Sequence, residues 1–266
     1  MRGPCCGAPD EDALFALPLD EHALAEAVLE IGRWREQGMQ FVTVLDPEYP
    51  ARLLDIRETP FLFYEGELRS HDLGMSVVGS RAASAAGLEL SRTVAQFLVS
   101  EGLTVIAGLA AGIDTAAHRA ALDAGGRTVA FLGNGITREY PKENAALQHE
   151  IGMNGLVLSQ FYPDAPPTKF TFPMRNASMS GYGLATIIVE AGELSGTRIQ
   201  ARLAREHGRP VILSSRVADE TTWGAALAGA PGIFVASTVG QLKDAIREII
   251  DAPGLLDSAL AELAAS

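Results

Sequence analysis

Cysteine and long apolar runs are scarce in this sequence. Among 266 residues there are only two cysteines, Cys5 and Cys6, and because they are adjacent they predict no disulfide framework. No apolar run is long enough to span a membrane, and the first residues, MRGPCCGAPDEDA, lack the apolar core of a signal peptide. We therefore expect a cytoplasmic protein with no membrane partner.

Signatures of bound metals and common cofactors are also missing. No HExxH or paired CxxC spacing occurs, so no metal site is expected. The strand-like run that ends at Gly79 is not followed by GxGxxG, and no acidic residue ends the next such run, which disfavours a nicotinamide dinucleotide. Asp114 and His118 have no nucleophile near them in the sequence. We expect neither a cofactor nor a catalytic constellation, and hence no enzyme.

Net positive charge is absent too, since the formal net charge is −12. The acidic residues are concentrated in the two flanks. From Met75 to Arg216 there are 13 Lys+Arg and 11 Asp+Glu, whereas the remainder holds 8 and 22. The central region is therefore close to neutral and leaves room for a local basic patch, which permits a polyanionic ligand.

The pattern of apolar residues divides the chain into three parts. Residues 1–12 have the composition of a disordered tail, and apolar residues at helical spacing predict a helix from Asp20 to Gln37. We assign residues 1–40 to a tail with a short helical module, 41–250 to the main domain and 251–266 to a C-terminal helical tail. A helix over Val239–Ile250 should break at Pro253-Gly254, with a last short helix after it.

The main domain alternates apolar strand-like runs with Ala-rich or amphipathic segments. This alternation is typical of an α/β fold with a doubly wound, mostly parallel sheet and helices on both faces. Ligands of such sheets bind beyond the carboxyl ends of the strands. Five turns should share that rim, four of them rich in glycine, and they begin at Gly79, Gly108, Gly133, Gln160 and Glu190.

The stretch Thr104–His118, TVIAGLAAGIDTAAH, is the most informative of these segments. It reads as a short strand, a tight glycine turn and a helix with Asp114 at its N-cap. Backbone N–H groups in such a turn, together with the positive end of the helix, suit a phosphate. The alternative is that the glycines only make the turn and that Asp114 only caps the helix.

Three further segments have the chemistry to hold an anion. Gly79-Ser80-Arg81 combines a backbone turn, a hydroxyl and a guanidinium that can bind phosphate with two hydrogen bonds. Ser195-Gly196-Thr197 opens another helix, where Ser195 could equally be a plain N-cap. Aromatic residues of FTFPMRNASMSG stand beside Lys169, Arg175 and Asn176, a combination suited to single-stranded nucleic acid, although composition alone favours a loop with Phe170 and Phe172 buried.

Several motifs in one order resemble the DNA-processing protein A (DprA/Smf) family. They are LDPEYPARLLDI–PFLFYEGEL, VVGSR, GLAAGIDTAAHRAALDAGGRTVAFLGNGITREYPKEN, FPMRN and VEAGELSGTRIQARLAREHGRPV, and they span about Phe41 to Leu213. The GLAxGID…AH and YPxEN pieces are specific, so their joint occurrence is not expected by chance.

The resemblance implies an extended Rossmann-like fold and a non-catalytic activity. Family members bind single-stranded DNA, help to load the RecA recombinase onto it during natural transformation, and form homodimers through this domain. The family's DNA pocket maps here onto Gly79, Ser80 and Arg81, onto Gly112 and Asp114, and onto Arg175 and Asn176. Arg81 and Arg175 would pair with phosphate.

The sequence departs from the family pattern in two places. The family usually has a basic residue where Met174 stands and a second arginine where Ala177 stands, so two cations of the pocket are missing. Each lost phosphate contact reduces the salt dependence of DNA binding by roughly one unit of slope. Many members also carry a C-terminal winged-helix domain, for which about fifty residues after Arg216 leave no room.

Two other classes of function remain open at this point. A nucleotide-binding sensor, or a hydrolase like the Lonely Guy phosphoribohydrolases, could use the same scaffold, with Glu190, Glu193 and Gly196-Thr197 as the residues that resemble the hydrolase motif. A purely protein-binding role through the acidic flanks is the third possibility.

Overall fold

The computed structural model describes the backbone of residues 20–265 and the side chains of residues 20–252. The chain divides between Gln40 and Phe41 into two compact units. The first contains helix α1 (Glu21–Glu36), which is capped by the carboxylate of Asp20 through the N–H groups of His22 and Ala23. The helix expected from the sequence is thus confirmed, whereas the tail expected over residues 1–12 lies outside the described residues.

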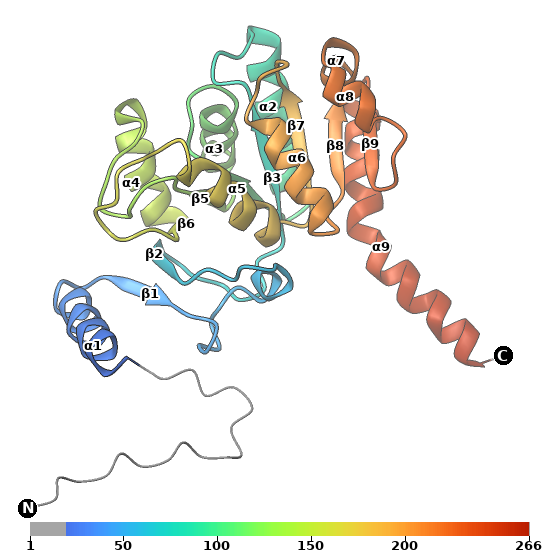
Figure 1. Ribbon diagram of the computed structural model, residues 1–266. Helices are drawn as coiled ribbons and strands as arrows, with labels where there is room; N and C mark the ends of the chain where they lie inside the picture. Colours follow the sequence, from blue (N-terminus) through green and yellow to red (C-terminus); the bar gives the residue numbers. More distant parts are fainter. Residues whose placement is uncertain (1–19, 266) are drawn as a thin grey trace, which may run out of the picture. The chain divides into compact units, whose positions relative to one another are not determined.

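A nine-stranded sheet organises the rest of the chain, in the order β1-β2-β6-β5-β4-β3-β7-β8-β9 (Figure 1). Strand β2 pairs antiparallel with β6, and every pair from β6 to β9 is parallel. The expected mostly parallel α/β sheet is confirmed. The strands are β1 (Gln40–Val42), β2 (Leu62–Gly66), β3 (Gly74–Gly79), β4 (Thr104–Ala107), β5 (Thr128–Phe131), β6 (Leu156–Ser159), β7 (Thr186–Glu190), β8 (Val211–Ser214) and β9 (Ile233–Ala236).

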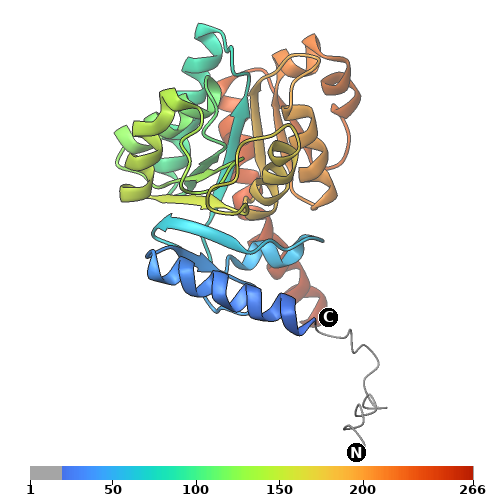
Figure 2. The same ribbon diagram turned by 60° about the vertical axis from the view of Figure 1, so that its left-hand side comes forward.

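Helices cover both faces of this sheet (Figures 1 and 2). They are α2 (Ala85–Ser100), α3 (Ile113–Asp123), α4 (Ala145–Asn154), α5 (Thr171–Tyr182), α6 (Thr197–Glu206), α7 (Ser215–Glu220), α8 (Thr222–Leu227) and α9 (Val239–Ala265), with short 3-10 turns η1 (Ala51–Asp55) and η2 (Lys142–Asn144). The central strands are fully buried, which explains why they appear in the sequence as continuous apolar runs.

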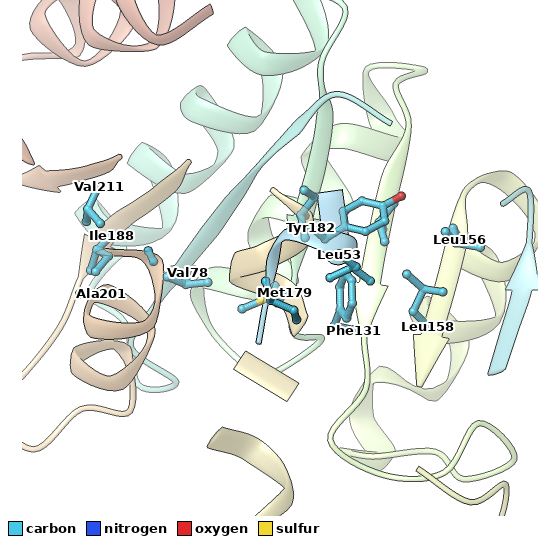
Figure 3. Close-up of a cluster of buried hydrophobic side chains, with 14 of the residues drawn as sticks. Leu53, Val78, Phe131, Leu156, Leu158, Met179, Tyr182, Ile188, Ala201 and Val211 are labelled. Carbon is cyan, nitrogen blue, oxygen red and sulfur yellow. The ribbon is translucent and has the colours of Figure 1, made fainter. Parts of the chain in front are cut away.

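Successive residues of each central strand point into two different cores. Val78 and Ile188 join the core beneath η1, α5 and α6, together with Met179 and Tyr182 of α5 (Figure 3). Val77 and its neighbours join the opposite core, built with α2, α3 and α9. The period-two alternation of a strand thereby gives each layer of helices its own apolar surface.

The strand order reverses at the centre of the sheet. From β3 the chain proceeds outward through β4, β5 and β6, then returns to place β7 on the other side of β3. A crevice beyond the carboxyl ends of the strands at such a reversal is the usual ligand position in this architecture.

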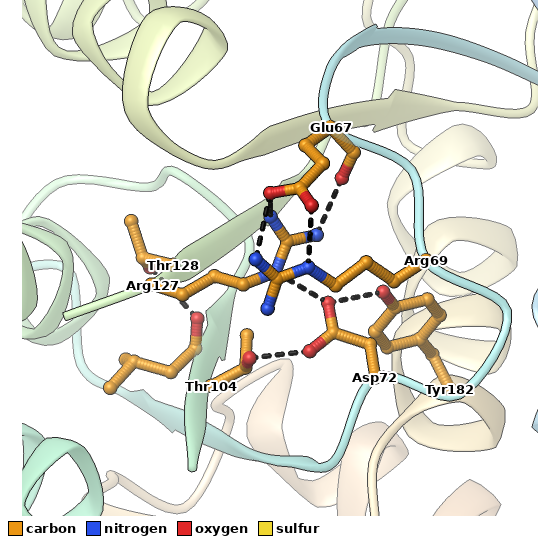
Figure 4. A network of polar contacts seen from close by, with 8 residues as sticks. Glu67, Arg69, Asp72, Thr104, Arg127, Thr128 and Tyr182 are labelled. Carbon is orange, nitrogen blue, oxygen red and sulfur yellow. Dashed lines mark hydrogen bonds and ion pairs between the residues drawn. The ribbon is translucent and has the colours of Figure 1, made fainter. Parts of the chain in front are cut away.

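The opposite rim carries a polar network that anchors the amino ends of the strands (Figure 4). The buried carboxylate of Asp72 accepts hydrogen bonds from the Tyr182 hydroxyl at 2.9 Å and from Arg127 Nε at 2.8 Å, and a third from the Thr104 hydroxyl. Arg127 also donates to the carbonyl of Glu67. Because these groups come from β4, α5 and the segments before β3 and β5, they fix the strands beneath the ligand rim.

Three local predictions were wrong. Asp114 is not the N-cap of α3, because Gly112 occupies that position and Asp114 lies in the first turn. The FTFPMRNASMSG segment is largely helix α5 rather than a loop; Pro173 is tolerated because N–H groups in a first turn need no helical partner. Helix α9 continues through Pro253-Gly254. The φ angle of proline is compatible with a helix, although an interior proline removes one backbone hydrogen bond and crowds the carbonyl four residues earlier.

Candidate functional site

A hollow of about 460 Å³ lies at the carboxyl ends of β3, β4 and β7. Its size falls within the range of roughly 300–1,000 Å³ that is usual for small-molecule sites. It occupies the reversal point of the strand order, as the fold predicts. The predicted residues that line it are Gly79, Ser80, Arg81, Asp114, Arg175, Asn176, Ser195, Gly196 and Thr197.

Arg81 is the available cation of this hollow. Its side chain is exposed and makes no hydrogen bond or ion pair with any residue between 20 and 252. The guanidinium lies over the ring of Phe172, 5.1 Å from the ring centroid. A cation held on an aromatic face keeps its hydrogen-bond donors free for an anion, and Arg81 is therefore suited to a phosphate.

An aromatic surface continues from Arg81. Tyr140 and Phe172 lie with ring centroids 5.9 Å apart, and both line a smaller cleft that shares Arg81 and Arg175 with the main hollow. Phe170 is 69% exposed, with the Lys169 ammonium 5.1 Å from its ring centroid. The expectation that Phe170 is buried was therefore wrong. Exposed rings beside cations can stack on nucleic-acid bases.

In the glycine turn after β4, two of the amides that the sequence suggested for a phosphate are bonded within the protein. The buried carboxylate of Asp114 accepts hydrogen bonds from the N–H of Gly108 at 2.9 Å and from that of Ala110 at 3.4 Å. Burial raises the pKa of Asp114, while the charge of Arg175 and these two hydrogen bonds oppose the rise. An internal carboxylate thus engages two backbone donors of the turn.

The guanidinium of Arg175 binds backbone carbonyls of the protein and has little surface available to a ligand. It is only 6% exposed, and its Nη1 donates to the carbonyls of Gly108, at 2.5 Å, and Phe131, at 2.7 Å. Its Nε donates to the side-chain oxygen of Asn176 at 3.0 Å. Burial lowers the pKa of Arg175 to about 10, against the opposing charge of Asp114. The guanidinium stays charged at neutral pH and ties α5 to the ends of β4 and β5.

His118 is buried behind the same turn. Its Nδ1 lies 2.7 Å from the Thr128 hydroxyl, which itself donates to the carbonyl of Val105, so Nδ1 carries the proton. Burial lowers the pKa of His118 to about 3, with a smaller contribution from Arg175. The residue is a neutral core histidine and does not face the hollow.

The turn after β7 is open in comparison. Leu194 is 98% exposed at the edge of the hollow, and the Ser195 hydroxyl accepts hydrogen bonds from the N–H and hydroxyl of Thr197. The N-cap position of α6 belongs to Gly196, so Ser195 does not cap the helix in the expected way. This turn brings small polar groups and one bare apolar side chain to the rim.

Two of the predicted site residues lie away from the hollow. Gly112 packs its α-carbon against the backbone carbonyls of Ser80 and Arg81, where a Cβ atom would collide with both. Lys169 stands beside Phe170 and does not line the hollow. Met174, where the sequence lacks an expected cation, is 49% exposed on α5 and is also outside it.

Sequence reasoning missed Tyr140 and Leu194. Tyr140 comes from the loop after β5, and its position could have been suggested by the YPKEN segment beside the glycine turn Gly133-Asn134-Gly135. Leu194 had no signal in the sequence, because an apolar residue between glutamate and serine does not reveal that its side chain is exposed.

The two glutamates that a hydrolase would need already form hydrogen bonds within the protein. Glu190 accepts hydrogen bonds from the N–H and hydroxyl of Ser84 and pairs with Arg216 at 3.3 Å. Glu193 accepts from the N–H and hydroxyl of Thr222. Neither carboxylate lines the hollow, so the geometry does not favour the hydrolase alternative.

The described residues contain neither a metal-binding cluster nor a membrane-spanning helix. No group of three or more His, Cys, Asp or Glu side chains is placed to hold a metal ion within that part of the chain. In the same residues, no helix combines the length and the apolar character that crossing a membrane requires.

Known proteins resemble this chain in sequence and in fold. DNA processing protein DprA of Streptococcus pneumoniae is 45% identical over 175 residues, covering 64% of this chain and 61% of that protein, and Smf of Escherichia coli is 40% identical over 183 residues, covering 67% and 49%. The X-ray structure of the S. pneumoniae protein matches with a TM-score of 0.73 and 34% identity, over 84% of this chain and 81% of that one. The chain spans about half to three fifths of the length of these curated relatives.

The family model for DNA recombination-mediator protein A matches residues 40–248, a range that contains all nine strands of the sheet and every residue that lines the hollow. The parallel sheet, the reversal point and the motifs around Arg81 and Asp114 all fall within this match. The chain therefore belongs to the DNA recombination-mediator protein A family.

Proposed function

We propose that this protein binds single-stranded DNA in the hollow between β3, β4 and β7 and acts as a mediator of recombination. The observation that carries the proposal is Arg81, an exposed guanidinium free of protein hydrogen bonds and ion pairs among the described residues, held on the Phe172 ring. Phosphate would bind Arg81, and bases would stack on Tyr140, Phe172 or Phe170.

The family relationship supports the same conclusion. A DprA from Helicobacter pylori, whose structure was described for its single-stranded DNA binding mode, shares this fold at 22% identity with a TM-score of 0.70, over 79% of this chain and 96% of that one. We extend the proposal to the partners that the family suggests. The protein would load a RecA-type recombinase on incoming single-stranded DNA during natural transformation, as a cytoplasmic homodimer and without catalysing a reaction itself.

The roles within the site follow from burial. Arg81 would make the direct phosphate contact, and Ser80, Asn176, Ser195, Gly196 and Thr197 would contribute polar groups around it. Asp114, Gly112 and Arg175 would hold the rim in shape, since their polar groups or α-carbons are already engaged with backbone atoms. Lys169 would contact the strand outside the hollow, next to the exposed Phe170 ring.

The test is fluorescence anisotropy of a labelled oligo(dT) of about 20 nucleotides, longer than most single-domain site sizes, at several salt concentrations. Wild-type binding should weaken steeply with salt, and Arg81→Ala should reduce affinity at least tenfold because the principal phosphate contact is lost. Arg92→Ala, which removes the same charge from an exposed position on α2, is the matched control. Absence of wild-type binding at low salt would refute the proposal.

Thermal unfolding of the same proteins separates binding from folding. Arg81→Ala should have the melting temperature of the wild-type protein, because the side chain is exposed and its guanidinium rests on the Phe172 ring without a hydrogen bond to the described residues. A mononucleotide that raises the melting temperature while oligo(dT) does not bind would indicate a nucleotide sensor instead.

A further inference from the structure

Helix α6 carries a row of arginines that the proposed DNA pocket does not use. Arg198, Arg202 and Arg205 follow one another at spacings of four and three residues, so they share one face of the helix. All three are exposed. The opposite face, with Thr197, Gln200, Ala201 and Ala204, is buried against the sheet. The row is notable in a chain with a net charge of −12.

Two further hollows lie beside this row, and each shares lining residues with the next, beginning at the proposed DNA pocket. A second hollow of about 360 Å³ is lined by Leu194 and Ser195, which also line the main hollow, by Arg198 and Arg202, and by Glu193 and Ile199. A third, of about 380 Å³, shares Arg198 and Arg202 with the second and extends to Arg205 and Trp223. We call the second and third hollows together the α6 groove.

Nearby acidic groups leave most of this positive charge uncompensated. Glu193 is held by two hydrogen bonds from Thr222, which are the main reason that its pKa is lowered, with a smaller contribution from Arg198. Glu206 pairs with Arg202 at 2.8 Å, but both side chains are at least half exposed. Exposed pairs at this spacing contribute only about 0.3–0.5 kcal/mol, so a phosphate can displace Glu206.

The Arg205 side chain is exposed and makes no hydrogen bond or ion pair with any residue between 20 and 252. The three arginines span about 10 Å along the helix axis at 1.5 Å per residue. That distance corresponds to roughly two or three successive phosphates of a strand, whose spacing is at least about 3.4 Å. The groove therefore has the charge and the length to accept a short run of backbone beyond the pocket.

We propose that the α6 groove is a second part of the DNA site, in which Arg198, Arg202 and Arg205 pair with the phosphates of nucleotides that follow the one bound at Arg81. This inference rests on the proposed DNA-binding function. A polyanionic strand is favoured over an acidic protein segment because the groove shares Leu194 and Ser195 with the adjoining pocket that would hold the same strand. Leu194 lies at the junction, where its bare side chain can pack against a base.

The test uses oligo(dT) of two lengths. About 5 nucleotides is close to the smallest single-domain site size, and about 20 nucleotides exceeds the largest. The variant is Arg198→Gln/Arg202→Gln/Arg205→Gln in the full chain. Its control is Arg92→Gln/Arg119→Gln/Arg247→Gln, which removes the same charge from α2, α3 and α9, helices of the opposite face, where Arg92 and Arg247 are exposed and Arg119 is partly exposed. Affinity is measured by anisotropy, with the short oligonucleotide as a competitor.

The α6 variant should bind the short oligonucleotide like wild type but lose at least tenfold in affinity for the long one. Its salt slope for the long strand should fall by about two units, since each single-strand phosphate contact contributes about 0.7. The control variant should keep the wild-type slope. Arg81→Ala should instead weaken binding at both lengths.

Three results would overturn the inference. If wild type binds both oligonucleotides and the α6 variant keeps the wild-type slope for the long one, the groove carries no phosphate although the DNA-binding function stands. If a poly-glutamate peptide binds wild type and not the α6 variant while long-strand affinity is unchanged, the groove is a protein-docking surface. If wild type binds no oligonucleotide, the proposed function fails together with the inference.

Discussion

The β4–α3 and β7–α6 units have the same local design but opposite roles. Each consists of a buried strand, a glycine-containing turn and a helix, and Asp114 and Arg198 are both the second residues of their helices. His118 and Arg202 each follow four residues later. In the first unit these charged or polar groups are buried, whereas in the second they face solvent.

The difference comes from what covers each helix. Helix α3 packs between α2 and α4, so nearly all of its surface is enclosed, and its short alanines permit that close packing. Helix α6 packs on the sheet and α5 (Figure 1), and its arginine row is exposed. The closed unit stabilises the rim, and the open unit offers charge to a ligand.

The largest effect on stability should come from replacing Arg175, which holds the closed β4–α3 unit together. Arg175→Met should reduce the free energy of unfolding by about 3–5 kcal/mol, because it leaves Asp114 without its countercharge and two strand-end carbonyls without a donor. Arg198→Met in the open unit should change it by no more than about 0.5 kcal/mol. Urea unfolding followed by circular dichroism measures both, and equal losses would contradict the distinction.

A glycine from each turn gives a smaller contrast. Gly112 has φ +81°, and an added Cβ would lie 2.3 Å from the Ser80 carbonyl oxygen, so Gly112→Ala should cost about 1–3 kcal/mol. Gly196 has φ −61° with open space around it, so Gly196→Ala should be neutral or stabilise by up to about 1 kcal/mol. Differential scanning calorimetry should show a lower melting temperature for Gly112→Ala than for wild type. The melting temperature of Gly196→Ala should be unchanged or higher.

The smallest effect is a pH dependence that originates in the closed unit. The pKa of His118 is about 3 in the folded protein and 6.5 in an unfolded chain, so the unfolded state binds more protons between these values. Stability should therefore be full above pH 6.5 and fall as the pH decreases below it, by about 1 kcal/mol between pH 7 and pH 5.5.

His118→Asn tests this assignment, because its amide can still donate to the Thr128 hydroxyl but does not titrate. The variant should lose less stability than wild type between the two pH values in urea unfolding. The exposed His71→Asn is the control and should show the wild-type loss. An undiminished loss in His118→Asn would exclude this histidine as the source.

Much of the fold could be predicted from local pattern. Buried parallel strands produce uninterrupted apolar runs, and the Ser84 N-cap and Ala-rich segments mark the helices between them. The prediction of helix boundaries failed where a residue type occurs both inside helices and at their ends. Proline in a first turn or within a helix, as at Pro173 and Pro253, can belong to regular structure, although in isolation it indicates a break.

The sequence by itself determined the α/β class, the shared rim of strand-end turns, nine of the hollow's lining residues and the family resemblance, because these depend on periodicity and on motifs that are local in the chain. Only the tertiary structure decided which charges are free. Arg175 donates a hydrogen bond to the carbonyl of Phe131, 44 residues away in the chain. Arg81 instead lies over the Phe172 ring, and the α6 groove is lined by Arg198, Arg202 and Arg205. A charge is available to a ligand only where no distant segment has already satisfied it, and that depends on packing between segments far apart in the chain.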